Sequence, residues 1–514
     1  RPTSVRNFGS RPNRFGFCTV QGVGGGILSV ATGCVTICYV GRVMPTRIDG
    51  SIYLSCAEVA EACGVSRQTI WRWRQAGAIP RGELRRGRAV LFSETEVEFV
   101  RAVAAGDFPA AQSASEAIYL DNAASARPTA AVRDAVLRAM QDDFGNPSSP
   151  HSSGLTARRS LAEAREAVAA LVGADPEGVV FTSGGTEANN LAIHGCVAKG
   201  FRRIVISAVE HPSVTESAEA ASRSGVEVVV LPVDRSGVVN RDALAAIAVD
   251  GSTLVSIQWA NSETGVIQSI AELSEMVKSR GGVVHCDAVQ AAGKIAVDFA
   301  TLPIDALTIT SHKLHGPQGV GALVLKPSFP RQPLFWGGSQ ESGRRGGTEN
   351  YPGIVGFGVA ASQRMATMRG FIRRTRAMRD FIESELLRRV PVARINGGGT
   401  RVCNITNLSI PGVDGQALVA LLDARGIRLS QVSACSNMRP EPSRVLRSMG
   451  LSEDDAYSSF RVSVSEDTAF EQCRRAVEEI VAVVAKLGGL VTSEVDSSWR
   501  PRVRQKPEAA LEVA

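Results

Sequence analysis

Short apolar segments alternate with amphipathic helical segments from Ile118 to about Leu487. The apolar segments are rich in β-branched residues and have the length of buried strands. Strands separated by helices run parallel, because each helix returns the chain to the edge at which the next strand begins. We therefore predict an α/β fold built on a parallel sheet. The predicted strands are Val179–Phe181, Ile204–Ser207, Val226–Leu231, Leu254–Trp259, Val283–Cys286 and Ala306–Ile309, and the predicted helices include Ala157–Leu171, Glu187–Val197 and Ile270–Ser279.

Two of the predicted strands lead into ionisable residues. Asp287 follows the strand that begins at Val283, and Lys313 comes shortly after Thr310. Both lie at the carboxyl edge of the sheet, where α/β folds bind ligands. A desolvated lysine there can attack an aldehyde, and an acid can hold a protonated ring nitrogen, which is the pair that pyridoxal phosphate (PLP) needs. Taken singly, the acid could be a turn residue or helix cap, and the lysine a solvated loop charge.

Two further strand ends carry residues suited to such a cofactor. The segment 182–187, Thr-Ser-Gly-Gly-Thr-Glu, follows a strand and opens a helix, so its backbone amides and the helix N-terminus could bind a phosphate. His211 lies between Glu210 and Pro212 after the next strand. Its imidazole could stack on a cofactor ring and exchange protons, or it could simply cap a helix.

Length and charge limit the remaining possibilities. A chain of 514 residues holds two or three domains. Its net charge is +6, but five arginines before Met44 supply +5 with no acid among them, so the whole protein lacks the basic balance of a nucleic-acid-binding chain. Ten cysteines include no Cys-x-x-Cys pair, which argues against a zinc ribbon or a disulfide framework. We expect reduced thiols, a cytoplasmic location and no metal site.

The two ends of the chain differ from its centre. Residues 1–43 are Arg- and Gly-rich, and they could be a signal peptide or weak membrane segment, or a leader that is not native protein. We favour the second interpretation, because the glycines suit a spanning helix poorly and Met44 precedes the first well-patterned segment. Residues 108–117 are predicted to be a linker, and residues 491–514 a disordered tail.

A small separate unit is predicted over residues 44–107. Ser55 with Glu58 forms a capping box, Gly64 turns the chain, and Ser66 caps a second helix. A basic hairpin at residues 81–92 and a third helix from Ser93 complete a pattern that resembles the winged helix-turn-helix of the MerR and excisionase families. The alternative is a helical protein-interaction module with solvated arginines. We expect Arg67, Gln68 and Thr69 to face DNA bases, and Arg72, Arg74, Arg85, Arg86 and Arg88 to face phosphates.

From Ile118 to Leu487 the chain resembles the PLP-dependent cysteine desulfurases of the NifS and IscS type, which have the fold-type I aminotransferase architecture. The resemblance implies a large domain at 118–375, a small domain at 376–490, and a homodimer. It runs through Tyr119–Ala124, Gly145–Ser149, Phe181–Ala192, Glu210–His211, Asp287–Gln290, Ser311–Lys313, Arg345–Thr348 and Ser433–Cys435.

The resemblance also implies a role for each site residue. Lys313 would be the Schiff-base lysine and Asp287 the partner of the pyridinium nitrogen. Gln290 would contact the ring oxygen, and His211 would stack on the ring and act in catalysis. Arg461 would pair with the substrate carboxylate. The phosphate would be held by Gly185, Thr186, Thr310 and His312, and by Thr348 from the partner subunit.

Cys435 decides between reactions. Most lone cysteines are buried apolar residues, but this one lies in a polar segment after a strand and would be accessible. Its thiolate could take the sulfur of PLP-bound L-cysteine as a persulfide, release alanine, and pass the sulfur to an acceptor protein.

Three departures from the family pattern affect rate and acceptor choice more than reaction type. The family's second asparagine is Ser262 here, so its contact with PLP would be weak or through water. Val432-Ser433 and Ser465-Glu466 also replace the usual residues.

Two other functions remain open. One is a transcription regulator whose aminotransferase-like domain senses PLP or an amino acid. The other is a different PLP enzyme, such as a selenocysteine lyase. Lys313 together with Cys435 favours the desulfurase, because a sensor needs no persulfide thiol.

Overall fold

The computed structural model describes residues 51–75, 84–86, 89–93, 117–330, 332–431 and 442–488, with residues 46–48, 97, 100, 101, 104 and 490. The chain divides into two compact units, residues 1–105 and 106–514. Several predictions lie outside the described residues: the leader at 1–43, nearly all of the linker, the tail, and the residues Arg88, Val432, Ser433 and Cys435. Among the described helices, none is long and apolar enough to cross a membrane.

The described part of the first unit includes two helices joined by a tight turn. Glu58 accepts from the backbone N–H of Ser55 at 2.6 Å, which confirms the predicted capping box. Gly64 makes the turn with a φ of +65°. The apolar side chains of Val59, Ile70 and Phe92 are fully buried between the helices and a sheet of order β1-β2-β4-β3. The elements are β1 Thr46–Ile48, β2 Ser51–Ser55, α1 Cys56–Ala62, α2 Arg67–Gln75, β3 Leu84–Arg86 and β4 Ala89–Ser93.

A seven-stranded sheet in the order β6-β12-β11-β10-β9-β7-β8 forms the centre of the second unit. Each strand predicted from the sequence is present to within about two residues. One strand was not predicted, and β12 runs antiparallel to both β11 and β6. The connection from β11 to β12 is too short for a crossover helix, so the chain must reverse direction. The strands are β6 Val179–Thr182, β7 Arg203–Ser207, β8 Glu227–Leu231, β9 Thr253–Gln258, β10 Val283–Asp287, β11 Ala306–Thr310 and β12 Gly321–Leu325.

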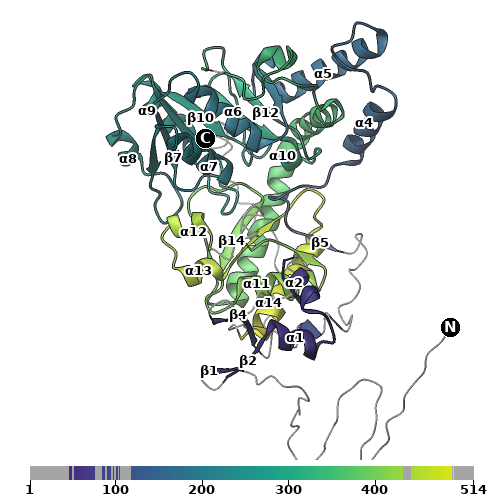
Figure 1. Ribbon diagram of the computed structural model, residues 1–514, viewed down its shortest axis with the longest axis vertical. Coiled ribbons are helices and arrows are strands. Elements are labelled where there is room, and N and C mark those ends of the chain that lie inside the picture. Colours follow the sequence, from purple (N-terminus) through teal and green to yellow (C-terminus); the bar gives the residue numbers. More distant parts are fainter. Residues whose placement is uncertain are drawn as a thin grey trace, which may run out of the picture. The chain divides into compact units, whose positions relative to one another are not determined.

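Helices cover both faces of this sheet (Figure 1). On one face, Val205 and Val255 pack with Leu273 of α9, whereas on the other face Ile204 and Leu254 lie in the same core as Leu191 of α6. Burial on both sides explains why the strands are continuously apolar rather than alternating. The helices are α4 Ala130–Gln141, α5 Ser152–Leu171, α6 Gly185–Val197, α7 Pro212–Ser222, α8 Arg241–Ala246 and α9 Ile270–Lys278, with 3₁₀ turns η1 Pro176–Gly178, η2 Ser311–Lys313 and η3 Gln340–Gly343.

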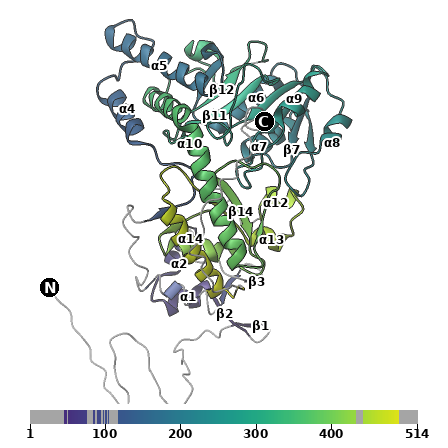
Figure 2. The ribbon, with the colours of Figure 1, turned by 180° about the vertical axis from the view of Figure 1, so that it is seen from behind.

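A second lobe packs around its own core of Leu408, Phe460 and Ile480. Helix α10 runs unbroken from the sheet lobe into this lobe (Figures 1 and 2), so the boundary predicted at residue 375 falls inside a helix. Strand β5 lies at the start of the range predicted for the large domain, but it pairs with β15 and packs in the second lobe. The elements are β5 Ile118–Tyr119, α10 Tyr351–Arg389, β13 Arg394–Ile395, β14 Ile405–Ser409, α11 Gly415–Asp423, β15 Ile427–Arg428, α12 Arg444–Ser448, α13 Glu453–Tyr457, β16 Ser459–Ser463 and α14 Phe470–Lys486.

Candidate active site

The two residues that suggested a cofactor site lie at the ends of neighbouring strands. Strands β10 and β11 pair in parallel with Asp287 opposite Thr308, and Lys313 lies in the η2 turn that follows β11. The Lys313 ammonium donates to the carbonyl oxygens of Ala123 and Ala124, each at 2.6 Å. Parallel pairing therefore brings the lysine, the acid and the Ala123–Ala124 loop to one edge of the sheet.

Asp287 is held in place by a residue to which the sequence analysis gave no role. Asp287 is 6% exposed, and its carboxylate accepts from Asn189 Nδ2 at 2.8 Å and from the backbone N–H of Val289 at 3.0 Å. Asn189 also donates to Ser213 at 2.8 Å. Its position one helical turn after Gly185 places it on the inner face of α6, which was the signal available in the sequence.

His211 is the N-cap of α7, so the helix-capping interpretation is confirmed. Its Nδ1 accepts from the backbone N–H of Ser213 at 3.1 Å. Burial lowers the pKa of His211, the Asp287 charge opposes this shift, and the Lys313 charge adds to it. The influence of both charges on its pKa shows that the ring lies in the same site. Because Nδ1 accepts, the neutral ring carries its proton on Nε2.

Gln290 is held by a buried lysine, Lys294, which the sequence analysis also missed. Its Nε2 donates at 2.8 Å to the carbonyl of Ala123, which also accepts from Lys313, and its Oε1 accepts from Lys294. Burial lowers the pKa of Lys294 to about 7; the charge of Cys403 opposes this shift and that of Lys313 adds to it. Gln290 and Lys294 are four residues apart in the loop after β10, and that spacing was visible in the sequence.

The expected phosphate residues differ in how open they are. Gly184 has a φ of +154°, which other residues rarely adopt, and a Cβ added there would meet nothing within 4 Å. A Cβ at Gly185 would lie 3.0 Å from Val289, so α6 approaches the Asp287 loop closely. Thr186 is exposed, whereas Thr310 is buried and donates to the carbonyl of Val320 at 3.2 Å.

His312, like Lys313, contacts the loop that contains Ala123, Ala124 and Ser125. Its Nδ1 is 3.4 Å from Ser125 Oγ. Burial, with added repulsion from Lys313, Lys294 and His211, lowers its pKa to about 3. His312 is therefore neutral at physiological pH, where its ring can donate one hydrogen bond.

These residues fit PLP. The site offers the lysine Lys313, the buried acid Asp287, which Asn189 already holds by a hydrogen bond, and the N-terminus of α6. The residue before that helix, Gly184, has free space beside its Cα. That set supplies an amine for an aldehyde, an anion for a ring N–H, and amides for a phosphate.

Arg461 lies in the middle of β16, and its side chain is 2% exposed. Its Nη1 donates to the carbonyl of Ser262 at 2.9 Å, and its Nη2 donates to Asp121 at 2.5 Å. Its Nε finds no hydrogen-bond partner among the described residues. Ser262 therefore takes part through its backbone, next to Asn261, whose side chain caps the local turn.

The segment that contains Cys435 begins and ends beside these residues. Ser430 exchanges backbone hydrogen bonds with Arg461. Ser443, on the far side of the segment, donates to Glu263 at 2.5 Å, one residue from Ser262. Both described ends are therefore anchored at the site.

Comparison with known proteins agrees with this arrangement. Residues 118–475 match the Aminotransferase class-V family, and residues 53–98 match a helix-turn-helix domain. A cysteine desulfurase of Sinorhizobium fredii is 44% identical over 376 residues, covering 72% of this chain and 97% of that protein. A cysteine desulfurase of Trichormus azollae is 40% identical over 376 residues, covering 73% and 94%.

The chain belongs to the cysteine desulfurases of the class-V aminotransferase family. A solved NifS-like protein is 32% identical with a TM-score of 0.67, and the match covers 72% of this chain and 100% of that one. The structure of SspA in complex with cysteine is 30% identical with a TM-score of 0.60, covering 68% and 98%.

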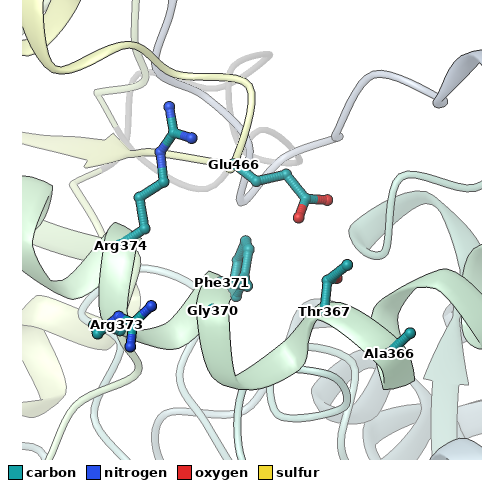
Figure 3. A pocket seen from close by; sticks show the side chains of 7 residues that line it. All are labelled: Ala366, Thr367, Gly370, Phe371, Arg373, Arg374 and Glu466. Atoms are coloured by element: carbon teal, nitrogen blue, oxygen red, sulfur yellow. The ribbon is translucent and has the colours of Figure 1, made fainter.

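Glu466, one of the residues at which this chain departs from the family pattern, borders a cavity that is separate from the candidate cofactor site. The cavity has a volume of about 450 Å³ and is lined along one side of α10 (Figure 3). Glu466 lines it and pairs with Arg364 at 3.2 Å. None of the predicted cofactor or substrate residues lines it. The lining residues are Ala366, Thr367, Gly370, Phe371, Arg373, Arg374 and Glu466.

The predicted DNA-binding residues lie on α2 of the first unit. Arg67, Gln68 and Arg72 are exposed, whereas Thr69 is half-buried and bonds Ser66, the cap of the helix. Arg74 lies 5.8 Å from the Phe92 ring and contacts Cys56. The β3–β4 hairpin pairs as predicted, which places Arg85 and Arg86 on a wing. Arg74 is thus the predicted phosphate contact that the unit supports least.

Proposed function

We propose that this enzyme uses PLP to move the sulfur of L-cysteine onto Cys435, leaving L-alanine and a persulfide for an acceptor protein. The observation that supports this most directly is the anchoring of both ends of the Cys435 segment beside Arg461 and Ser262. Cys435 is five residues from Ser430, a length of chain that reaches at most about 17 Å. A thiol on that tether is within range of a substrate held by Arg461.

The cofactor would be held by the residues at the carboxyl edge of the sheet. Lys313 would bind it, Asp287 would hold a proton on its ring nitrogen, and His211 would stack on the ring. Gln290 would contact the ring oxygen, with Ser262 as a weaker partner. When bound, PLP supplies an aldehyde for the substrate amine and a sink for electrons. Its phosphate would lie among Gly185, Thr186, Thr310 and His312, with Thr348 contributed by a partner subunit.

The transfer balances without an added oxidant or reductant. The Cys435 thiolate forms an S–S bond with the substrate sulfur while the substrate C–S bond breaks. The carbon keeps that electron pair and gains a proton, which gives the methyl group of alanine. Arg461 would hold the substrate carboxylate throughout, because a guanidinium suits that geometry.

A homodimer is supported by apolar side chains left exposed in the second unit. Leu137 and Met140 on α4 are 52% and 62% exposed, and Phe144 and Trp336 are each 74% exposed. Leu137 and Met140 are three residues apart on α4 and so lie on one face, and an exposed apolar patch of this kind often marks an interface. Thr348 is exposed too, as the partner-subunit role requires.

The first prediction tests the sulfur acceptor. Cys435→Ala should abolish alanine release from L-cysteine, because no thiolate remains to take the sulfur, while the absorbance band of bound PLP persists. Cys56→Ala, in the first unit, is the matched control and should leave turnover unchanged. Alanine release is measured with L-cysteine and, in parallel, with L-selenocysteine.

Undiminished turnover of L-cysteine by Cys435→Ala would contradict the assignment. A strong preference for L-selenocysteine would favour the selenocysteine lyase instead.

A further inference from the structure

An ion pair lies inside the proposed substrate site. Arg461 Nη2 donates to Asp121 Oδ1 at 2.5 Å. The arginine side chain is 2% exposed and the aspartate side chain 20% exposed. A buried guanidinium needs an anionic or hydrogen-bonding partner, because an uncompensated buried charge is strongly destabilising. Asp121 supplies that partner.

The geometry of the pair is incomplete. A guanidinium grips a carboxylate with two donors, either Nε with Nη2 or Nη1 with Nη2. Nη1 donates to Ser262, and Nε finds no partner among the residues that the structure describes. Asp121 therefore occupies Nη2, the one nitrogen that both arrangements share, and it does so through a single oxygen, Oδ1. A substrate carboxylate cannot form either two-donor grip without competing for Nη2.

The two partners differ in how firmly they are held. The Arg461 backbone pairs with Asn407 in β14 and with Ser430, and its Nη1 is fixed by Ser262. The Asp121 backbone is also fixed, since its carbonyl accepts from Ala124 at 3.0 Å. Its side chain, however, is partly exposed and short. The carboxylate can rotate towards solvent while the guanidinium stays in place.

We propose that Asp121 is an internal counter-ion of Arg461 that the substrate carboxylate displaces. This inference rests on the proposed role of Arg461 as the carboxylate-binding residue. The Asp121 contact is made before the substrate binds and is given up afterwards, so its free energy is subtracted from that of binding. Asp121 thereby sets the affinity for the amino acid, as a positioning residue rather than a catalytic one.

The test uses the full-length, PLP-loaded enzyme. Asp121→Asn keeps the shape and removes the charge, so the KM for L-cysteine should fall about fivefold, the size of a partly exposed ion pair. The effect should appear in KM rather than in kcat. Asp454→Asn, exposed on α13, removes a charge elsewhere and should leave KM unchanged. An unchanged or raised KM in Asp121→Asn would show that the aspartate only orients Arg461.

A second measurement does not depend on turnover. Asp121→Asn should melt at a lower temperature than the parent enzyme, because Arg461 loses its counter-ion, and 3-mercaptopropionate should restore more stability to the variant than to the parent. Cysteamine, which has the thiol and amine but no carboxylate, should restore no such difference. Asp121→Ser should behave like Asp121→Asn and replaces it if that variant does not fold.

The Arg461→Gln variant distinguishes a failure of the carboxylate-binding role of Arg461 from a failure of the counter-ion role of Asp121. If this variant responds to 3-mercaptopropionate as the parent does, the carboxylate role of Arg461 is wrong. If the response is lost in Arg461→Gln but Asp121→Asn matches the parent, only the counter-ion proposal is overturned.

Discussion

At the scale of single residues, the site depends on buried polar groups that would not themselves touch the substrate. Asn189 orients Asp287 through a hydrogen bond. Lys294 orients Gln290 by donating to its amide oxygen, and the amide nitrogen of Gln290 donates to the carbonyl of Ala123, which also accepts from Lys313. Such satisfied networks fix side-chain geometry, because each unpaired group would carry a desolvation cost. The network has a cost, because it keeps the Lys294 ammonium out of water.

The burial of Lys294 predicts that the stability of the folded protein depends on pH. Burial lowers the pKa of Lys294 to about 7, whereas the unfolded chain binds that proton below about pH 10.4. Between those values the unfolded state holds more protons, so the free energy of unfolding rises with pH. Lys294→Met should flatten this rise. Urea unfolding at about pH 7 and about pH 10 measures it.

The exposed Lys199→Met serves as the control for that experiment and should keep the parent's slope. An equally steep rise in Lys294→Met would mean that another group causes the pH dependence.

At the scale of elements, a short reversal between β11 and β12 presents Lys313. The η2 turn holds the lysine, and Gly316 packs directly against it: a Cβ at this position would lie 1.9 Å from Ser311 Oγ and 3.1 Å from both the Ser311 carbonyl and Ala360 Cβ. The tight turn therefore leaves no room for a side chain. The short connection also explains why β12 runs antiparallel to β11.

Gly316→Ala should displace the turn and with it Lys313. We expect kcat to fall about tenfold or more, since small misplacements of a reacting group are costly, with a shift in the absorbance of bound PLP. Gly370→Ala is the control, because a Cβ there meets nothing within 4 Å. In the interior of α10 that change should stabilise the protein by about 0.5–1 kcal/mol. Parent-like kinetics in Gly316→Ala would show that the turn adapts.

At the scale of the whole molecule, a class-V enzyme is joined to a helix-turn-helix unit with its own core. Arg67 and Arg72 are exposed on α2, which gives that helix positive charge at its surface. We propose that the unit binds DNA through α2, with the β3–β4 hairpin as a wing. The chain as a whole is close to neutral after residue 43, so any such binding must come from this local charge.

Gel retardation of duplex DNA should therefore depend steeply on salt. Arg72→Ala should weaken binding to all sequences and reduce the salt slope by about 0.9, the value for one phosphate contact. Arg223→Ala, an exposed arginine of the second unit, is the matched control. Retardation that ignores salt, or its complete absence, would favour a protein-interaction module.

The sequence alone determined the α/β class and the two-unit organisation, and it led to the residues that are proposed to react. Short continuous apolar runs bounded by turn residues indicated buried strands. Residue type and position made Lys313 and Asp287 candidates, whereas Arg461 came from the family resemblance. The sequence did not determine which polar residues support them, since Asn189 and Lys294 carry no local signal beyond their four-residue spacing from Gly185 and Gln290. The boundary at 375 was also placed inside α10, because one amphipathic pattern can serve two lobes.

Only the tertiary structure decided the contacts between distant segments. The β5 strand joined the second lobe, β12 reversed direction, and Asp121 came to lie against Arg461, which is 340 residues away in the chain. Local propensity and periodicity describe a segment's own conformation. Which charges meet inside the protein depends on how the lobes pack, and that is set by burial summed over the whole unit.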